Sequence, residues 1–184
     1  WSTYSPSFKN ELLEAERAKD ELRDIMTRMV GASIHYTNLG YWMRQPPFGF
    51  TGEKVNTPNG KRVVLKPDEQ EAPYMIRMFE MRAEGIYTDE QIADELNRLG
   101  FRTRIQYVRD KHDKTQIIKK IGGVPMTAKK IGYYVSKLTY AGVIKEKWTK
   151  DEPVKAQFEG LVSLTLFNKA NRGKLFVEIS PDNK

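Results

Sequence analysis

The chain has 184 residues, of which 39% are hydrophobic and 30% charged, which is room for one ordinary domain with a real core. It has no cysteine and only two distant histidines, so disulfides, thiol nucleophiles and Cys-based zinc sites are excluded and a His-rich metal site is disfavoured. No apolar run approaches 18 residues and no apolar export segment opens the chain. We therefore expect a cytoplasmic globular protein that uses no cofactor and does not enter a membrane.

The positive charge is concentrated in one part of the chain. Residues 1–100 hold 13 Lys and Arg against 16 Asp and Glu, a net of −3. Residues 101–150 hold 13 against 3, a net of +10, and residues 151–184 balance at 5 against 5. Such a concentration is typical of a protein that binds a polyanion such as nucleic acid, although a lysine-rich solvated face gives the same count.

The first segment is expected to be a long helix. Ser5 and Pro6 suit a helix start, and apolar residues then recur at helical spacing along one narrow stripe: Phe8, Leu12, Ala15, Leu22, Ile25, Met26 and Met29. A stripe this narrow favours a connector, or a helix that packs on a partner, over one enclosed by a core. Gly31 is expected to end the helix, with an extension through Ala32–Tyr36 as the alternative. Because the chain begins on Trp1 and not on Met, we interpret it as a fragment of a longer protein.

An irregular segment and a hairpin come next. Residues 40–50 contain two prolines and two glycines, which exclude a helix. Residues 54–56 and 62–65 read as strands on either side of Asn59-Gly60, a favoured turn pair.

Two helices follow. Asp68 opens the first, with Pro73 in its first turn, an apolar face of Ala72, Ile76 and Phe79 with Met75 beside it, and an end at Gly85. The second has a capping box formed by Thr88 and Gln91, an apolar face of Ile92, Ala93, Leu96 and Leu99, and an end at Gly100.

The basic part of the chain begins with residues 101–123, which read as a loop or an extended ribbon. Thr127 is expected to cap a short helix whose inner face is Ile131, Val135 and Leu138 and whose outer face is Lys129, Lys130, Tyr133 and Lys137. Residues 143–148 alternate like a strand, Ser163 caps a last helix that ends at Gly173, and residues 174–184 are expected to fray.

No catalytic constellation is visible. The chain has no phosphate-binding loop, nucleophile elbow or zinc-protease motif. Asp68, Glu69 and Glu71 cluster, but acidic residues in the first turn of a helix favour its dipole and need no catalytic role. An enzyme acting on acidic substrates is a rival hypothesis, but it would need convergent titratable groups in a pocket, and the sequence shows none.

DNA binding is the function that the basic part favours. The capped helices 88–99 and 127–138 suggest a helix-turn-helix-like pair with a ribbon inserted between them, and the second helix would suit a major groove. The candidate DNA-binding residues are Arg44, Arg102, Arg104, Thr127, Lys129, Lys130, Tyr133, Tyr134 and Lys137. Alternatively, Tyr134 is half buried and the lysines are merely solvated. Arg44 suits a minor groove or a plain structural link, and Gly132 suggests a close approach by another element or by DNA.

Several motifs, in order, resemble the recombinase domain of large serine recombinases, the phage-type serine integrases. They are Gly40-Tyr41-Trp42, Pro46–Phe50, Leu65, Glu71–Glu80, Gly85, Ile92–Gly100, Thr103, Lys130-Ile131 and Leu138–Gly142. The resemblance covers residues 40–142. Each motif is weak alone, and their order makes the set specific. Residues 6–30 resemble the long helix that joins this domain to the catalytic domain, and residues 153–173 resemble the segment after it.

The resemblance implies a module that binds half of an attachment site on double-stranded DNA, with Arg44 near the minor groove and residues 127–138 in the major groove. A serine nucleophile would lie in a domain outside this chain, which is then not an enzyme by itself. The parent would act as a dimer or tetramer in integration or excision of a prophage or mobile element, and the fragment alone could be a monomer. The ribbon 104–123 looks like an insertion, and Met126 replaces an aromatic residue that is common in the family.

The expected fold is α+β and predominantly helical, with a long N-terminal helix, a small hairpin and a helix-turn-helix-like core. We assign residues 1–38 to a connector helix, 39–150 to the recombinase DNA-binding domain and 151–184 to a following helix and tail. The rival hypotheses are a stand-alone helix-turn-helix transcriptional regulator, which would need a sensor or dimerisation domain, and an RNA-binding or scaffold module.

Overall fold

The computed structural model describes residues 7–58 and 60–178. Its helices are α1 (Phe8–Asn38), α2 (Ala72–Glu84), α3 (Asp89–Arg98), α4 (Ala128–Val135) and α5 (Leu164–Ala170), with 3-10 turns η1 (Leu138–Ala141) and η2 (Lys147–Thr149). Its strands are β1 (Phe50–Thr57), β2 (Gly60–Pro67), β3 (Gln106–Arg109), β4 (Ile117–Ile121), β5 (Val143–Ile144) and β6 (Val154–Lys155). The strands form three antiparallel pairs, β1–β2, β3–β4 and β5–β6. The expected α+β, predominantly helical class is confirmed.

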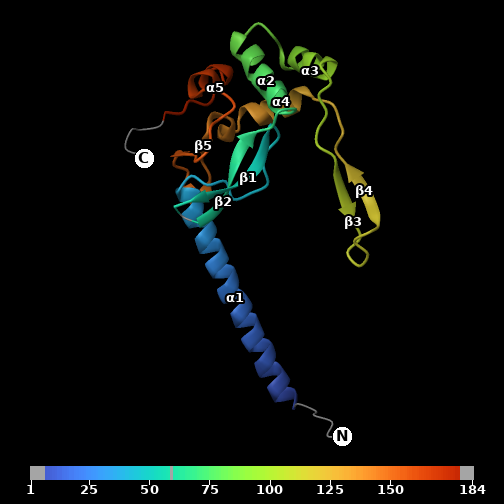
Figure 1. Cartoon of the computed structure of the whole chain (residues 1–184), viewed down its shortest axis with the longest axis vertical. Helices are drawn as coiled ribbons and strands as arrows, with labels where there is room; N and C mark the ends of the chain where they lie inside the picture. The colour runs from blue at the N-terminus through green and yellow to red at the C-terminus, as the bar shows by residue number, and fades with distance from the viewer. Residues whose placement is uncertain (1–6, 59, 179–184) are drawn as a thin grey trace.

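Helix α1 projects from the body of the molecule as a rod (Figure 1). Its 31 residues span about 46 Å, and nearly all of them are exposed. The expectation that Gly31 ends the helix is wrong, because a glycine stops a helix only where the backbone turns left-handed, and Gly31 stays helical. The helix ends before Gly40, which adopts φ 85° and lies so close to the Lys155 carbonyl that a Cβ would collide with it. The expected helix start at Ser5-Pro6 lies outside the described residues.

The first hairpin is longer than the sequence pattern predicts. Strands β1 and β2 pair over their whole length, from Phe50 opposite Pro67 to Thr57 opposite Gly60. Gly60 is therefore a paired strand residue and not the second residue of the turn, as the expected Asn59-Gly60 turn would require. Asn59 lies outside the described residues.

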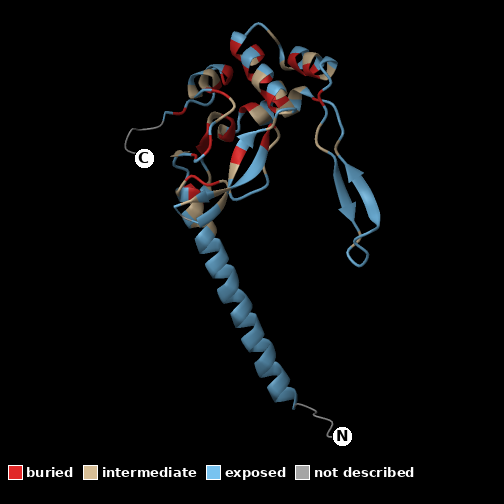
Figure 2. Cartoon of the chain, in the orientation of Figure 1, coloured by how far each residue is buried: buried red, intermediate tan, exposed pale blue. Residues whose placement is uncertain are grey.

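The core lies where α2, α3, α4 and α5 meet η1 and the first hairpin (Figure 2). Its largest fully buried side chains include the following aromatic residues: Phe50, Phe79, Phe101, Tyr140 and Phe167. The rings pack at ordinary aromatic distances, for example 5.6 Å between the centroids of Phe79 and Tyr140. These contacts join α2, α5, η1 and the first hairpin into one core.

Helix α2 begins later than predicted. It starts at Ala72, because the Asp68 carboxylate accepts hydrogen bonds from the amides of Gln70 and Glu71 and holds residues 69–71 in a turn. The predicted capping box of Thr88 and Gln91 is present in α3, but Leu99 is 48% exposed and does not extend the buried face.

Two predictions near the C-terminus need correction. Trp148 lies in η2 and not on a strand, since β5 is only two residues long. Residues 174–178 are tied to the body at Val177, whose backbone exchanges two hydrogen bonds with the Asn168 side chain. Residues 179–184 of the predicted frayed tail lie outside the described residues. Ser163 caps α5 as predicted, with its hydroxyl accepting from the Leu166 amide.

Candidate nucleic-acid interface

Helices α3 and α4 pack against each other although a ribbon separates them in sequence. Asn97, near the end of α3, fixes the approach to α4: its side-chain amide donates to the Met126 carbonyl (3.0 Å) and its oxygen accepts from the Met126 amide (2.7 Å). Met126 is itself buried in the core. The arrangement fixes where α4 begins.

One face of α4 is buried and the opposite face is basic. Ile131 and Val135 are buried, as the sequence pattern predicts. Lys129 and Tyr133 lie on the exposed face, and the ammonium of Lys137, which follows the helix, sits 4.5 Å from the centroid of the Tyr133 ring. Tyr133 is 58% exposed. The cation–π contact holds a positive charge and a phenol together at the surface.

The lysines of α4 are not neutralised within the molecule. Among the described residues, no carboxylate forms an ion pair with Lys129, Lys130 or Lys137. The Lys130 ammonium donates to the Pro125 carbonyl at 3.4 Å, which places it beside the start of the helix. Lys129 and Lys130 in α4, together with Lys137 just after it, form the α4 basic face; the helix ends at Val135, and Leu138, expected on its inner face, lies in η1.

Thr127 stands at the N-cap of α4 but does not cap it with its side chain. Its carbonyl accepts the first helical hydrogen bonds from Lys130 (2.9 Å) and Ile131 (3.2 Å), while its hydroxyl makes no cap hydrogen bond. The prediction of a side-chain cap is wrong, because the backbone alone makes these contacts. The hydroxyl is left exposed at the helix end.

Tyr134 belongs to the core more than to the surface. It is half buried against Phe48 and Tyr140, with ring centroids 6.4 and 6.2 Å away, and burial raises the pKa of its phenol. Gly132 is exposed, and a Cβ built there would have no neighbour within 4 Å. No other described element of the chain therefore approaches Gly132. The expectation that another element packs closely against this glycine is wrong.

Arg104 is engaged inside the molecule. Its guanidinium donates to both oxygens of Glu71, to the Pro46 carbonyl (2.9 Å) and to the Phe50 carbonyl (2.6 Å), while Glu71 also accepts from the Gly49 amide (2.9 Å). The hydrogen bonds to Glu71 raise the pKa of Arg104, so it stays charged. This cluster ties the irregular segment to α2 and to the base of the ribbon, so Arg104 is a structural residue and not part of an exposed basic surface.

Arg44 and Arg102 lie apart from the α4 basic face. Arg44 forms an ion pair with Glu146 and lies 5.5 Å from the Trp148 ring centroid, at the junction with η2. Its side chain is still 58% exposed. Arg102 is exposed and donates to the Phe101 carbonyl at 2.6 Å, where the ribbon leaves the body. The structure brings together Thr127, Lys129, Lys130, Tyr133 and Lys137, and leaves the arginines elsewhere.

Sequence reasoning missed three residues that matter for this surface. Glu71 and Asn97 position Arg104 and α4, and their partners lie 33 and 29 residues away, so no local pattern reveals them. Tyr107 is the third, because its place in β3 depends on the extended ribbon, one of the two alternatives for residues 101–123.

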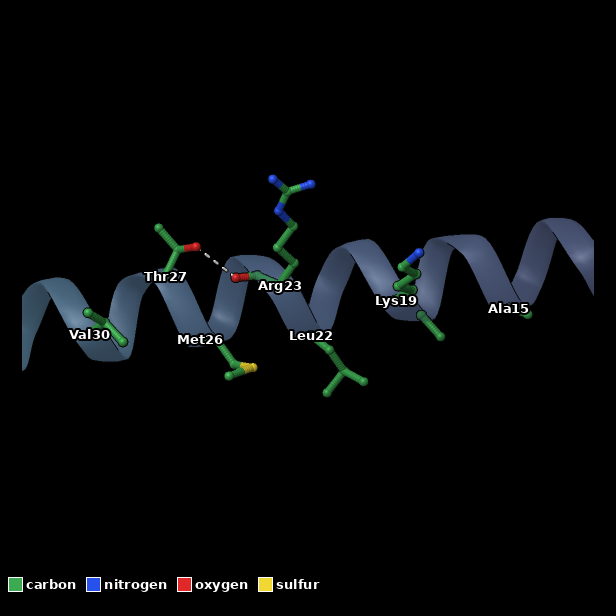
Figure 3. A pocket seen from close by; sticks show the side chains of 8 residues that line it. Ala15, Lys19, Leu22, Arg23, Met26, Thr27 and Val30 are labelled. Carbon is green, nitrogen blue, oxygen red and sulfur yellow. Dashed lines mark hydrogen bonds between the residues drawn. The ribbon is translucent and has the colours of Figure 1, made fainter.

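One surface site on the described part of the chain lies on α1, away from the α4 basic face. Figure 3 shows this site, which is lined by residues of α1, with the side chains of Leu22 and Met26 pointing to the same side of the helix. Within the described residues, no three His, Asp or Glu side chains gather as a metal ion would require. No helix in the described part of the chain is long and apolar enough to cross a membrane.

Comparison with known proteins finds likeness in structure and not in sequence. No family model and no curated protein sequence matches the chain. A large serine recombinase (LSR) in complex with DNA matches 79% of this chain and 37% of its own, at 18% identity and a TM-score of 0.52. A structure from work on the sequence requirements of the Listeria innocua prophage attP site matches 79% of this chain and 50% of its own, at the same identity and TM-score. The chain thus spans half or less of these neighbours, and it shares the fold of the part that it covers.

Proposed function

We propose that this chain is the DNA-binding part of a site-specific serine recombinase and that it binds half of an attachment site on double-stranded DNA. The α4 basic face carries the proposal, because its three lysines have no carboxylate partner among the described residues. The fold shared with a large serine recombinase–DNA complex supports the same assignment. So do the motifs of residues 40–142.

In the proposed complex, α4 lies in the major groove with its N-terminus toward the bases. The free hydroxyl of Thr127 would reach a base edge or phosphate there, since its side chain is not used as a cap. Lys129, Lys130 and Lys137 would neutralise phosphates along the groove walls. Exposed Gly132 would allow a close approach of the DNA backbone to the helix.

Arg44 is the proposed contact with the minor groove. Its guanidinium is more than half exposed and would exchange Glu146 for the electronegative floor of a narrow groove. The chain would have no nuclease activity by itself, because cleavage would need a serine nucleophile from another part of the recombinase. We also propose that α1 is the connector to that part.

The proposal is tested by fluorescence anisotropy of the chain with two duplexes at two salt concentrations. One duplex carries the attachment site that flanks the parent gene, and the other a shuffled copy of it. Tighter, salt-sensitive binding to the intact site is the expected result. Equal binding to both would reduce the function to non-specific DNA binding, and no binding at low salt would reject the proposal. A matched single-stranded RNA of the same sequence tests the RNA-binding alternative.

A further inference from the structure

The β3–β4 ribbon is a free-standing arm. It leaves the body between α3 and α4 and projects on the same side of the molecule as α1 (Figure 1). Every residue of both strands is exposed (Figure 2). Two-stranded ribbons without a packed face are only marginally stable in water, and their open edges invite pairing. An arm of this kind therefore points to a ligand that covers it.

The charges of the arm are arranged for an anion. Residues 106–121 hold five Lys and Arg against two Asp, a net of +3. Both aspartates are used within the turn: Asp110 accepts from the amides of His112 (2.7 Å) and Asp113 (3.1 Å), and Asp113 accepts from the amide of Thr115 (2.9 Å). Among the described residues, none of the arm's lysines forms an ion pair. The arm presents its cations outward.

The strand register places a cation on each side of the arm. Tyr107 pairs with Lys120, and the adjacent Val108 pairs with Lys119. Since successive side chains of a strand alternate, Lys119 and Lys120 lie on opposite sides. Exposed apolar groups accompany them, with Tyr107 at 53% and Ile118 at 61% exposure. Cations on two sides match a groove whose two walls carry phosphates, whereas protein–protein interfaces are depleted in lysine.

The base of the arm is fixed relative to α4. The Thr103 amide donates to the Val124 carbonyl (3.0 Å), the Gly123 amide donates back to the Thr103 carbonyl (3.0 Å), and the Thr103 hydroxyl accepts from the Val124 amide (3.1 Å). Gly122 lies so close to the Arg104 carbonyl that a Cβ would collide with it. Only residues 125 and 126 separate this clamp from Thr127, so the clamp fixes the base of the arm close to the start of α4.

The reach of the arm suits DNA next to the groove that α4 would occupy. About eight extended residues from Thr103 to Lys111, at about 3.3 Å each, span about 26 Å. That is about seven to eight base pairs at about 3.4 Å per pair. The arm could follow the duplex from the α4 site past one phosphate backbone.

We propose that the β3–β4 ribbon is a second DNA-binding arm, which extends the contact of α4 along the duplex through Lys119 and Lys120 on phosphates and Tyr107 and Ile118 against the groove. This inference rests on the proposed DNA-binding function. If the arm binds DNA, the chain protects a longer stretch of the duplex than α4 alone would. The lysines of the arm then add their own contribution to the salt dependence of binding.

Two variants of the whole chain test the arm. In the first, Asn-Gly replaces residues 105–121 and joins Arg104 to Gly122, so that the clamp and the Arg104 cluster remain. The second is Lys119→Gln with Lys120→Gln, which keeps the ribbon. The control is Lys169→Gln with Lys174→Gln, which removes the same charge from exposed positions on and just after α5. Far-ultraviolet circular dichroism and a thermal melt establish that each variant folds.

The first readout is a hydroxyl-radical footprint on a duplex of about 40 base pairs that carries the attachment half-site. The second is the slope of the logarithm of the binding constant against the logarithm of the salt concentration. We expect the arm-less variant to lose protection over about seven to eight base pairs at one end. We expect the double Gln variant to lower the slope by about 1.8, or about 0.9 for each lost phosphate contact, and the α5 control to leave it unchanged.

Outcomes for the arm and for the proposed function are distinguishable. If the wild-type chain binds and both arm variants keep its footprint and slope, the arm is not a DNA contact. If removal of the arm instead changes the sedimentation of the free protein and not its footprint, the arm pairs with a second copy and the inference fails. If the arm variants lose protection while Lys129→Gln with Lys130→Gln does not, the arm is supported and the assignment of α4 is rejected. Absence of wild-type binding overturns both.

Discussion

Arg104 and Lys129 carry the same charge in the same basic part of the chain, and their surroundings give them opposite roles. Arg104 is held by Glu71 and two backbone carbonyls, while Lys129 is exposed and has no carboxylate partner among the described residues. A planar guanidinium with several donors suits such a cluster, whereas a hydrated ammonium suits phosphate. Substitution of Arg104 should therefore change the stability of the fold, whereas substitution of Lys129 should change DNA binding.

Arg104→Ala should destabilise the fold without acting through DNA contact. It would leave Glu71 and the carbonyls of Pro46 and Phe50 without their donor, at a cost of about 2–3 kcal/mol in the free energy of unfolding. Arg104→Lys should recover only part of that loss, because a lysine ammonium cannot donate to Glu71 and to both carbonyls with the planar geometry of a guanidinium. Urea denaturation measures both values. An Arg104→Ala variant of wild-type stability that binds DNA more weakly would place Arg104 at the interface instead.

Lys129→Ala and Lys130→Ala should each weaken binding to every duplex and lower the salt slope by about 1. Thr127→Ala should instead reduce the preference for the intact site over the shuffled copy. Anisotropy titrations measure both effects, with Lys169→Ala on α5 as the control. If the two lysine variants keep wild-type affinity and slope, α4 does not lie in the groove.

Tyr140 should make stability fall at alkaline pH. Its phenol is 1% exposed and donates to the Phe48 carbonyl (2.9 Å), and burial raises its pKa well above the ordinary value of about 10. Because the pKa of this phenol is higher in the folded protein than in the unfolded chain, the stabilisation by the neutral phenol is complete below a pH of about 10. It is lost as the pH rises above that value. Tyr140→Phe should cost about 1 kcal/mol at pH 7 and lose less stability by pH 11. Urea denaturation at both pH values measures the free energy of unfolding. An equal loss of stability in the wild type and in Tyr140→Phe would contradict this prediction.

Among the elements, those with strong local patterns match their predictions best. The capping box of Thr88 and Gln91 forms as expected, and so do the buried positions Ile131 and Val135 of α4, although Leu138 lies outside the helix. Of the two alternatives for residues 101–123, the extended ribbon is the one that forms. Elements whose limits depend on distant contacts do not. Helix α1 runs past Gly31 to the packed Gly40, and Trp148 joins η2, where its carbonyl accepts from the Asn38 side chain (3.2 Å).

Phe79→Ala tests the helix packing that supports α4. Phe79 is fully buried, and its ring lies 5.6 Å from Tyr140 and 5.8 Å from Phe167. The substitution should cost roughly 3–5 kcal/mol, as for other buried aromatic residues. Phe176→Ala, at a residue that is 67% exposed, is the matched control and should change little. A thermal melt of Phe79→Ala that superimposes on the wild type would remove Phe79 from the core.

At the scale of the whole molecule, composition and order along the chain already determined much. The lack of cysteine, the +10 charge of residues 101–150 and the periodic apolar faces predicted an α+β, mostly helical protein with a basic surface. These signals are local or additive, so they survive without knowledge of the fold. Only the tertiary structure decided which cations are free, because the partners of Arg104 lie 33 to 58 residues away in sequence. The tertiary structure also decided that the β3–β4 ribbon lies outside the core, because burial depends on how distant segments pack together and not on any single segment.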